Sequence, residues 1–213
     1  MIQLVCDILK DRIADLPFVD VIAGLTQPVI DKRAAMTNAA DIKIQKRIPV
    51  SYDIADKQSA KNAHLGAERD LVPNSAKKSI IYFEDYGTTV DKAVKTGNFN
   101  VAMVGNIRLV CWLNRKELVI YKYKHISAHV MSEMLKVLVT GRSISDNGIT
   151  RMFVTASRLP VQDASIFARY NYDEAEFQYL RPPFEYFAID LTVRYCVSPE
   201  CLPYLNLNAE AHD

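Results

Sequence analysis

The chain has 213 residues, 49% hydrophobic and 24% charged, so it can bury a core and fits a globular protein better than a disordered or fibrous one. Lys and Arg together number 26 against 25 for Asp and Glu, a balance that does not indicate a dedicated nucleic-acid-binding protein, which usually has an excess of basic residues. No apolar run approaches the ~18 residues of a membrane span. These features predict a protein made in the cytoplasm that does not enter a membrane.

An amphipathic helix is predicted at the start of the chain. Apolar residues recur there at three- and four-residue steps, with charged residues between them: Ile2, Val5, Cys6, Leu9, Ile13 and Leu16. The helix is expected to end before Pro17, because a proline disfavours helical backbone in the residue before it. Residues 18–30 then carry Gly24 and Pro28 among apolar residues, which predicts a turn into a short strand or an extended arm.

Short strands are predicted on either side of a long polar stretch. The first covers residues 47–52, and Pro49 favours an edge position for it because proline cannot donate a hydrogen bond to a neighbouring strand. The second covers residues 80–83. A helical turn is expected at residues 90–94, before the chain enters the central part of the protein.

The polar stretch between these strands, residues 53–78, is charged and contains only isolated apolar residues. Connections longer than ~12 to 15 residues are uncommon inside compact domains and tend to be functional or disordered. We therefore expect a long loop or arm, which is either an isolated flexible loop or a segment that orders on a neighbouring subunit. On this interpretation, deletion of residues 55–76 leaves a folded monomer with impaired assembly.

A β-hairpin is predicted in the centre of the chain, over residues 101–123. Residues 99–113 are rich in β-forming side chains, Asn114-Arg115-Lys116 predicts a turn, and residues 118–123 have the character of a return strand. Gly105 lies inside the first of these strands, where an isolated glycine is typical of a β-bulge.

A second helix is predicted from Ser127, as the N-cap, to the residues before Gly141. Its apolar face is formed by Val130, Met131, Met134, Leu135 and Leu138, and should pack on the sheet. A strand follows at residues 152–156. Residues 157–181 are a mixed segment that is rich in aromatic and acidic residues. For the aromatic and charged run at 170–186 we prefer a subunit contact to stacked nucleic-acid bases, because its acidic residues would repel phosphates.

The longest strand is predicted near the C-terminus, over residues 184–197. Apolar and polar residues alternate there with a period of two, so one face should meet a core and the other water or a partner. The core face is expected to contain Ile189, Leu191, Val193, Tyr195 and Val197. Replacement of Leu191 or Val193 by Asp should then prevent folding, whereas Thr192→Asp should be milder.

Together these elements predict one α+β domain that covers residues 1–213. We expect a mostly antiparallel sheet with a long C-terminal strand, covered by an N-terminal and a central helix, with a long polar loop or arm at about residues 53–78. No internal repeat or break in composition indicates a second domain.

The sequence contains no motif that assigns a reaction. A phosphate-binding loop, a dinucleotide-binding turn and a nucleophile elbow are all missing. His125 and His129 are four residues apart and could share a helix face toward a metal, but no third ligand follows from the spacing. Cys196 and Cys201 are the only close cysteine pair; Pro199 between them leaves a bridge open, and reduced, packed thiols are preferred. We predict no catalytic, cofactor or metal site.

The layout resembles the tail-terminator, tail-completion and head-to-tail connector ring proteins of tailed bacteriophages. The likeness is carried by the opening helix with its exit Leu16-Pro17-Phe18-Val19-Asp20, by Gly24-Leu25-Thr26-Gln27-Pro28-Val29, by Arg47-Ile48-Pro49-Val50, by the helix at 130–138 and by residues 188–197. This likeness is a similarity of pattern that covers most of the chain. The polar insertion at 53–78 makes the chain longer than the simpler family members.

The resemblance implies a structural virion protein, made in the host cytoplasm, that forms a sixfold or twelvefold ring and docks portal-proximal, connector or tail proteins. It implies no enzyme activity, cofactor, membrane contact or sequence-specific binding of nucleic acid. Two other hypotheses stay open: a small cytoplasmic enzyme with an unrecognised His/Cys site, and a nucleic-acid-associated adaptor that uses basic residues of the arm. The candidate subunit contacts are Lys57, Lys61, Glu68, Arg69, Asn114, Arg115, Lys116, Tyr170, Tyr172 and Tyr179.

Overall fold

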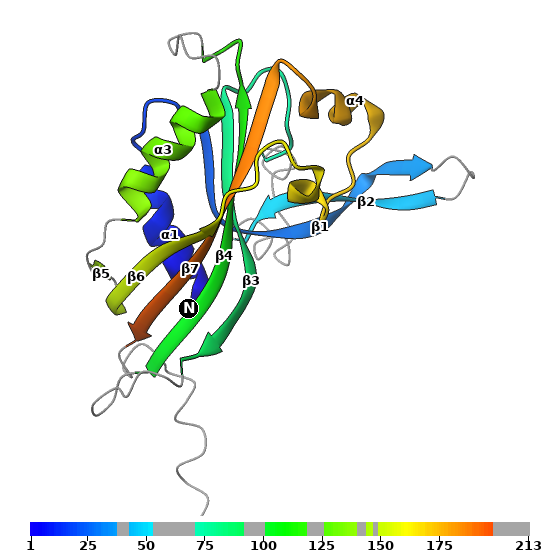
Figure 1. Cartoon of the computed structure of the whole chain (residues 1–213). Coiled ribbons are helices and arrows are strands. Elements are labelled where there is room, and N and C mark those ends of the chain that lie inside the picture. The colour runs from blue at the N-terminus through cyan, green and yellow to red at the C-terminus, as the bar shows by residue number, and fades with distance from the viewer. Residues whose placement is uncertain are drawn as a thin grey trace, which may run out of the picture.

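The computed structural model describes residues 1–37, 43–52, 71–91, 101–118, 126–139, 144–146 and 149–197. The elements run in the order α1 (Ile2–Ile13), β1 (Val21–Thr37), β2 (Lys43–Ser51), β3 (Ser79–Val90), β4 (Val101–Asn114), α3 (Ile126–Leu138), β5 (Ile144–Asp146), β6 (Ile149–Arg158), η2 (Ala164–Phe167), α4 (Glu174–Phe177), η3 (Gln178–Leu180) and β7 (Phe184–Val197). The described strands form one seven-stranded sheet in the order β2-β1-β3-β4-β7-β6-β5 (Figure 1).

The sheet is mostly antiparallel, as predicted. Only β1 and β3 pair in parallel among the described strands, and the other neighbours are antiparallel. Strand β7 has the bounds predicted for the long C-terminal strand and lies between β4 and β6. The predicted α+β class is therefore confirmed.

One face of the sheet is covered by α1 and α3 (Figure 1). The apolar stripe of α1 is buried there, and every second residue of β7 from Phe187 to Val197 belongs to the same core. The alternation predicted for β7 is thus confirmed. Gly105 brings α1 close to the sheet: a Cβ at this position would lie 2.7 Å from Cδ1 of Ile2. The core also takes up Ile81, Phe83, Leu109, Cys111, Val130, Met134 and Met152.

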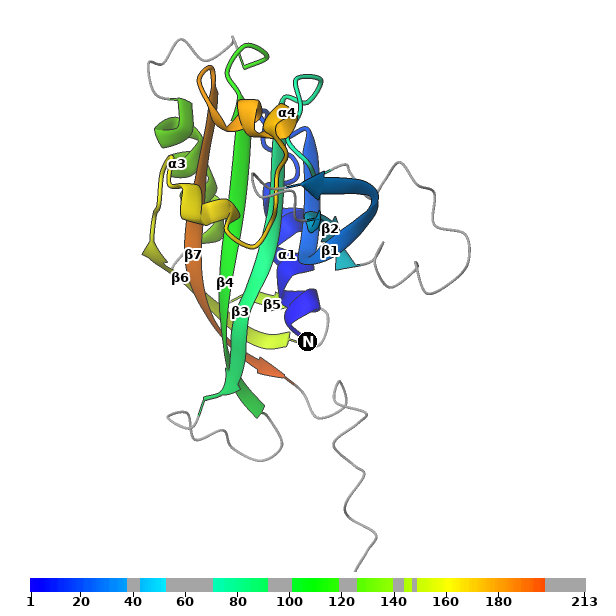
Figure 2. The same ribbon diagram turned by 90° about the vertical axis from the view of Figure 1, so that its right-hand side faces the viewer.

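A second core lies on the opposite face, beneath the segment that contains η2, α4 and η3 (Figure 2). Trp112 and Tyr82 are its largest fully buried side chains, and the indole N–H of Trp112 donates to the carbonyl oxygen of Tyr179 at 2.7 Å. This covering segment crosses only the half of the sheet where β7 begins. Among the described residues, no element covers this face over the half where β7 ends, which we call the open half (Figure 2).

Strands β1 and β2 form a hairpin that extends away from the rest of the sheet (Figure 1). Residues 18–30, predicted as a turn into a short strand or an arm, contain the first part of the long strand β1. Strand β2 is an edge strand, as Pro49 indicated, and Pro49 pairs with Pro28. The register shifts between Ile30 and Ala35.

The predicted hairpin over residues 101–123 is wrong. Strand β4 pairs with β3 along one edge and with β7 along the other, so no edge remains for a return strand. The turn at 115–118 is present and includes Leu118, while residues 119–125 lie outside the described residues. The hairpin partner of β4 is β3, and periodicity could not show this because it predicts a strand but not its neighbour.

The bulge predicted at Gly105 lies in the neighbouring strand. The three steps from Asp85 to Thr88 of β3 pair with only two steps of β4, from Ile107 to Gly105, and Gly87 within this stretch has a φ of +115°. A glycine adopts this backbone readily because it has no Cβ. Val90 is the last residue of β3 and Asp91 follows it without helical structure, so the predicted helical turn does not begin here; residues 92–94 lie outside the described ranges.

The second helix begins one residue before the predicted cap. Ile126 is its first residue, and the N–H of Ser127 donates to a carboxylate oxygen of Glu185 at 2.9 Å. A side chain of β7 therefore satisfies a backbone donor in the first turn. The predicted stop at Gly141 lies outside the described residues.

The expected arm at 53–78 is only partly described, because residues 53–70 lie outside the described ranges. Its last part belongs to the body of the protein. Leu71 and Val72 are 4% and 5% exposed, and they pack in the second core and against Ile48 and Val50 of β2, respectively. Burial of Leu71 and Val72 argues against the expectation that residues 55–76 can be removed without loss of folding.

Candidate assembly surfaces

The covering segment is held on the sheet by a buried carboxylate, Glu84 of β3. This side chain is fully enclosed, and it accepts hydrogen bonds from the hydroxyl groups of Tyr170 and Tyr86. Burial raises the pKa of Glu84, and the hydrogen bond from Tyr170 and the positive charge of Arg169 oppose this shift. The Arg169 guanidinium lies 3.8 Å from the carboxylate.

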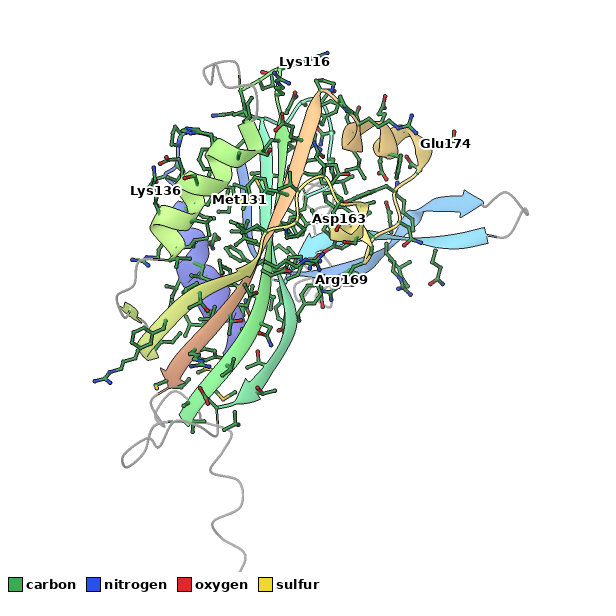
Figure 3. The ribbon with its side chains drawn as sticks, viewed as in Figure 1. Lys116, Met131, Lys136, Asp163, Arg169 and Glu174 are labelled. Carbon is green, nitrogen blue, oxygen red and sulfur yellow. The ribbon has the colours of Figure 1, made fainter. Side chains whose placement is uncertain are left out.

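The boundary between the covered and open halves is marked by Arg108 of β4. Its guanidinium donates two hydrogen bonds to Asp190 of β7, at 2.6 Å and 3.0 Å. It also lies over the ring of Tyr86, 4.7 Å from the centroid, with Arg169 at 5.5 Å from the same centroid. Figure 3 labels Arg169 and Asp163 where the covering segment crosses the sheet. The ring of Tyr86 is thus in contact with two guanidinium groups of its own chain.

A second polar cluster joins the hairpin to the covering segment. The amine of Lys46, a residue of β2, lies 2.6 Å from carboxylate oxygens of both Asp173 and Glu176, and its side chain is fully enclosed. The same two acidic residues form a capping box at the start of α4. The base of the hairpin is therefore fixed to the body through one lysine.

The open half of the sheet contains a groove of about 580 Å³ at the end of β7. Its apolar lining includes Ala102, Phe153, Tyr195 and Cys196, which come from three neighbouring strands. Phe153 is 48% exposed, although it lies in the middle of β6. Large apolar side chains exposed on a sheet are typical of contact surfaces.

Two arginines border this groove. Arg151 and Arg194 are both exposed, and Arg194 lies 3.9 Å from Asp91 in an ion pair. The side chain of Arg194 is still 69% exposed. The groove thus combines apolar lining with two arginines, and its lining includes one carboxylate, that of Asp91.

The three tyrosines predicted as subunit contacts instead contact residues of their own chain. Tyr170 is 6% exposed and donates to Glu84, and Tyr172 packs edge-on against Phe167 in the second core. Tyr179 is half-buried against Phe184. Aromatic side chains are favoured both in interfaces and in cores, so the sequence could not separate the two.

The residues predicted as contacts at the turn differ in their exposure, and those on the arm lie outside the described residues. Asn114 is 2% exposed and structural, because its amide donates to Ser75 and its oxygen accepts from the N–H of Lys116. Arg115 and Lys116 are both exposed, and Lys116 lies at the end of the molecule opposite the end of β7 (Figure 3). The four arm residues lie outside the described ranges: Lys57, Lys61, Glu68 and Arg69.

Within the described residues, no group of three or more His, Cys, Asp or Glu side chains could hold a metal ion. His129 is half-buried on α3, while its predicted partner His125 lies outside the described part of the chain, as does Cys201. Burial raises the pKa of the Cys6 thiol and that of the Cys111 thiol, so both stay protonated. Neither has the thiolate character that a nucleophile needs.

A scan against protein-family models finds no match, and a search of curated proteins finds no similar sequence. None of the helices in the described part of the chain has the length and apolar character needed to cross a lipid bilayer.

Proposed function

We propose that this chain is a structural protein of a tailed-bacteriophage virion, which forms a ring at the head-to-tail junction or the tail end and docks neighbouring connector or tail proteins. The observation that carries the proposal is the hairpin β1–β2, which projects from a body whose sheet is open over half of one face (Figures 1 and 2). A ring contact is heterologous: one patch of each copy meets a different patch of the next. A projecting hairpin and an open sheet face are two such patches.

The hairpin suits side-chain docking better than the addition of a strand. Pro49 lies in the edge strand β2 and has no N–H to donate, which interrupts a continuous ladder with another chain. Two residues before Pro49, the carbonyl oxygen of Arg47 already accepts a hydrogen bond from the N–H of Asn171 at 2.9 Å. The edge is therefore protected against uncontrolled strand pairing, while the side chains of Gln45 and Arg47 are exposed for contact.

The charge balance also favours self-association. A net charge of +1 gives identical copies little mutual repulsion, and a charge near zero promotes association. In addition, the ion pair of Lys46 already fixes the base of the hairpin, so docking of the hairpin would cost less conformational entropy.

The test is the mass of the purified full chain in solution, measured by light scattering after size exclusion, alone and with co-expressed products of neighbouring genes. Negative-stain images of the same fractions would reveal closed rings. Closed multimers, alone or on a partner, would support the proposal. A strict monomer under every condition would overturn it.

A further inference from the structure

We propose that the groove on the open face binds the C-terminal segment, residues 198–213, of a neighbouring copy of this chain. The inference rests on the proposed ring and names one of its contacts. The groove supplies the receptor, the segment supplies the ligand, and each copy would supply one of each. That is the arrangement a heterologous ring contact requires.

The groove fits an extended peptide with apolar side chains and acidic ends. Its lining is apolar at Ala102, Phe153 and Cys196, and Phe153 offers an exposed ring against which aliphatic or aromatic side chains can pack. At its borders, Arg151 and Arg194 are exposed cations that favour carboxylates. The weak ion pair of Arg194 with Asp91, at 3.9 Å, leaves its guanidinium accessible.

Residues 198–213, which lie outside the described residues, have the matching composition. The apolar residues Leu202, Tyr204, Leu205 and Leu207 form the middle of the segment, and Glu200, Glu210 and Asp213 flank them. The chain has no Lys or Arg after Arg194, so the segment carries only negative charge apart from His212. Apolar surface and charge are thus complementary to the groove.

The segment can reach a neighbouring copy. It leaves the sheet at Val197, one residue after a residue that lines the groove, and its length allows a span of up to about 50 Å. Pro199 biases Ser198 toward extended backbone, which favours continuation away from the sheet over an immediate reversal across the chain's own groove. We therefore assign the segment to the groove of the next copy.

A photo-activated cross-linker placed at Phe153 in the full chain tests this contact. Trypsin releases residues 195–213 as one peptide, because no Lys or Arg follows Arg194. We expect cross-linked dimers in which the peptide containing position 153 is joined to the peptide 195–213. The matched control is Leu159, which is 44% exposed but does not line the groove, and which should give no such adduct.

Adducts between these two peptides only in the monomer fraction would show docking within one chain and would overturn the inference. Adducts that never include residues 195–213 would also overturn it. Light scattering measures separately whether the wild-type chain forms an oligomer at all. An oligomeric wild-type chain without the 153-to-tail adduct leaves the proposed function standing, whereas a monomeric chain removes both.

A charge exchange gives a second readout. The variant Arg151→Glu/Arg194→Glu and the variant Glu210→Lys/Asp213→Lys should each lose the oligomer, while an equal mixture should regain it, because each groove then meets a segment of opposite charge. A mixture that stays monomeric would contradict the inference. Lys136→Glu, which reverses an exposed charge on α3, controls for charge reversal itself and should leave assembly unchanged.

Discussion

The amine of Lys46 lies 2.6 Å from a carboxylate oxygen of Glu176, in a place where the lysine side chain has no exposed surface. This contact joins the base of the projecting hairpin to helix α4 of the covering segment. An enclosed ammonium depends on its partners, because burial of an unpaired charge costs several kcal/mol. The pair therefore fixes two elements that are remote in sequence.

Lys46→Met should lower the free energy of unfolding by about 3 kcal/mol, because it leaves the carboxylates of Asp173 and Glu176 without their cation. Urea unfolding followed by circular dichroism measures this. The matched control is the triple variant Lys46→Met/Asp173→Asn/Glu176→Gln, which removes all three charges but keeps acceptors for the capping box. It should recover most of the loss, and a triple variant as unstable as the single one would contradict the role of charge.

Glu84→Gln should change how stability depends on pH. Burial raises the pKa of Glu84 above its ordinary value of 4.5, so the folded protein binds this proton more readily than the unfolded chain. The stability that protonated Glu84 contributes is fully present below pH 4.5 and is lost as the pH rises through the folded-state pKa. Glutamine does not titrate, so the free energy of unfolding of the variant should rise relative to that of the wild type as the pH is raised from 4 to 8.

Urea unfolding at a series of pH values measures the difference between the two proteins. Glu117→Gln, at an exposed position in the turn after β4, is the control and should show no such trend. A difference between Glu84→Gln and the wild type that is constant with pH would show that Glu84 does not titrate differently in the folded state.

The two faces of β7 should respond differently to aspartate. Leu191 is 1% exposed in the main core, so Leu191→Asp buries an unpaired carboxylate and should cost at least about 3 kcal/mol. Thr192 points to the open half of the sheet, where its hydroxyl lies 3.3 Å from Asn106, and Thr192→Asp should cost less than about 1 kcal/mol. Soluble yield and thermal unfolding report both. Equal tolerance would mean that the register of β7 is wrong.

Two nested deletions separate the polar stretch from the packed residues that follow it. Removal of residues 55–76 takes away Leu71 and Val72, and loss of each buried side chain costs about 1.5 to 3 kcal/mol. Removal of residues 55–69 leaves both in place and should be much milder. Thermal unfolding of the two variants measures the difference. Equal stability would show that Leu71 and Val72 contribute little.

The elements that could be predicted are those with a long, regular apolar pattern. Helix α1 repeats apolar residues over three turns, and β7 alternates them over its whole length, so burial alone determines both. The pairing of β4 with β7 could not be predicted, because hydrophobic periodicity gives no information on neighbours. The hairpin mistake at 118–123 has this cause.

The candidate surfaces were harder to predict than the fold. Lys46 is a lysine in a polar edge strand, which usually indicates exposure, and its partners Asp173 and Glu176 come from the far end of the chain. Tyr170 was assigned to a subunit contact, although Glu84 gives its hydroxyl a buried partner. Phe153 had no signal of its own, since strand 152–156 was predicted without its faces. The pairing of β6 with β7 is what shows that the phenyl ring of Phe153 lies on the open face.

The position of β7 in the sheet has a consequence for biosynthesis. Strand β4 pairs along its whole length with β7, and β6 also needs β7 as its neighbour, so the middle of the sheet stays incomplete until β7 has left the ribosome. Until then, β4 has no hydrogen-bonded neighbour along the edge that β7 occupies, and such incomplete sheets are prone to aggregation. Chains truncated before residue 184 should therefore collect in inclusion bodies, because the sheet can close only once β7 has been made.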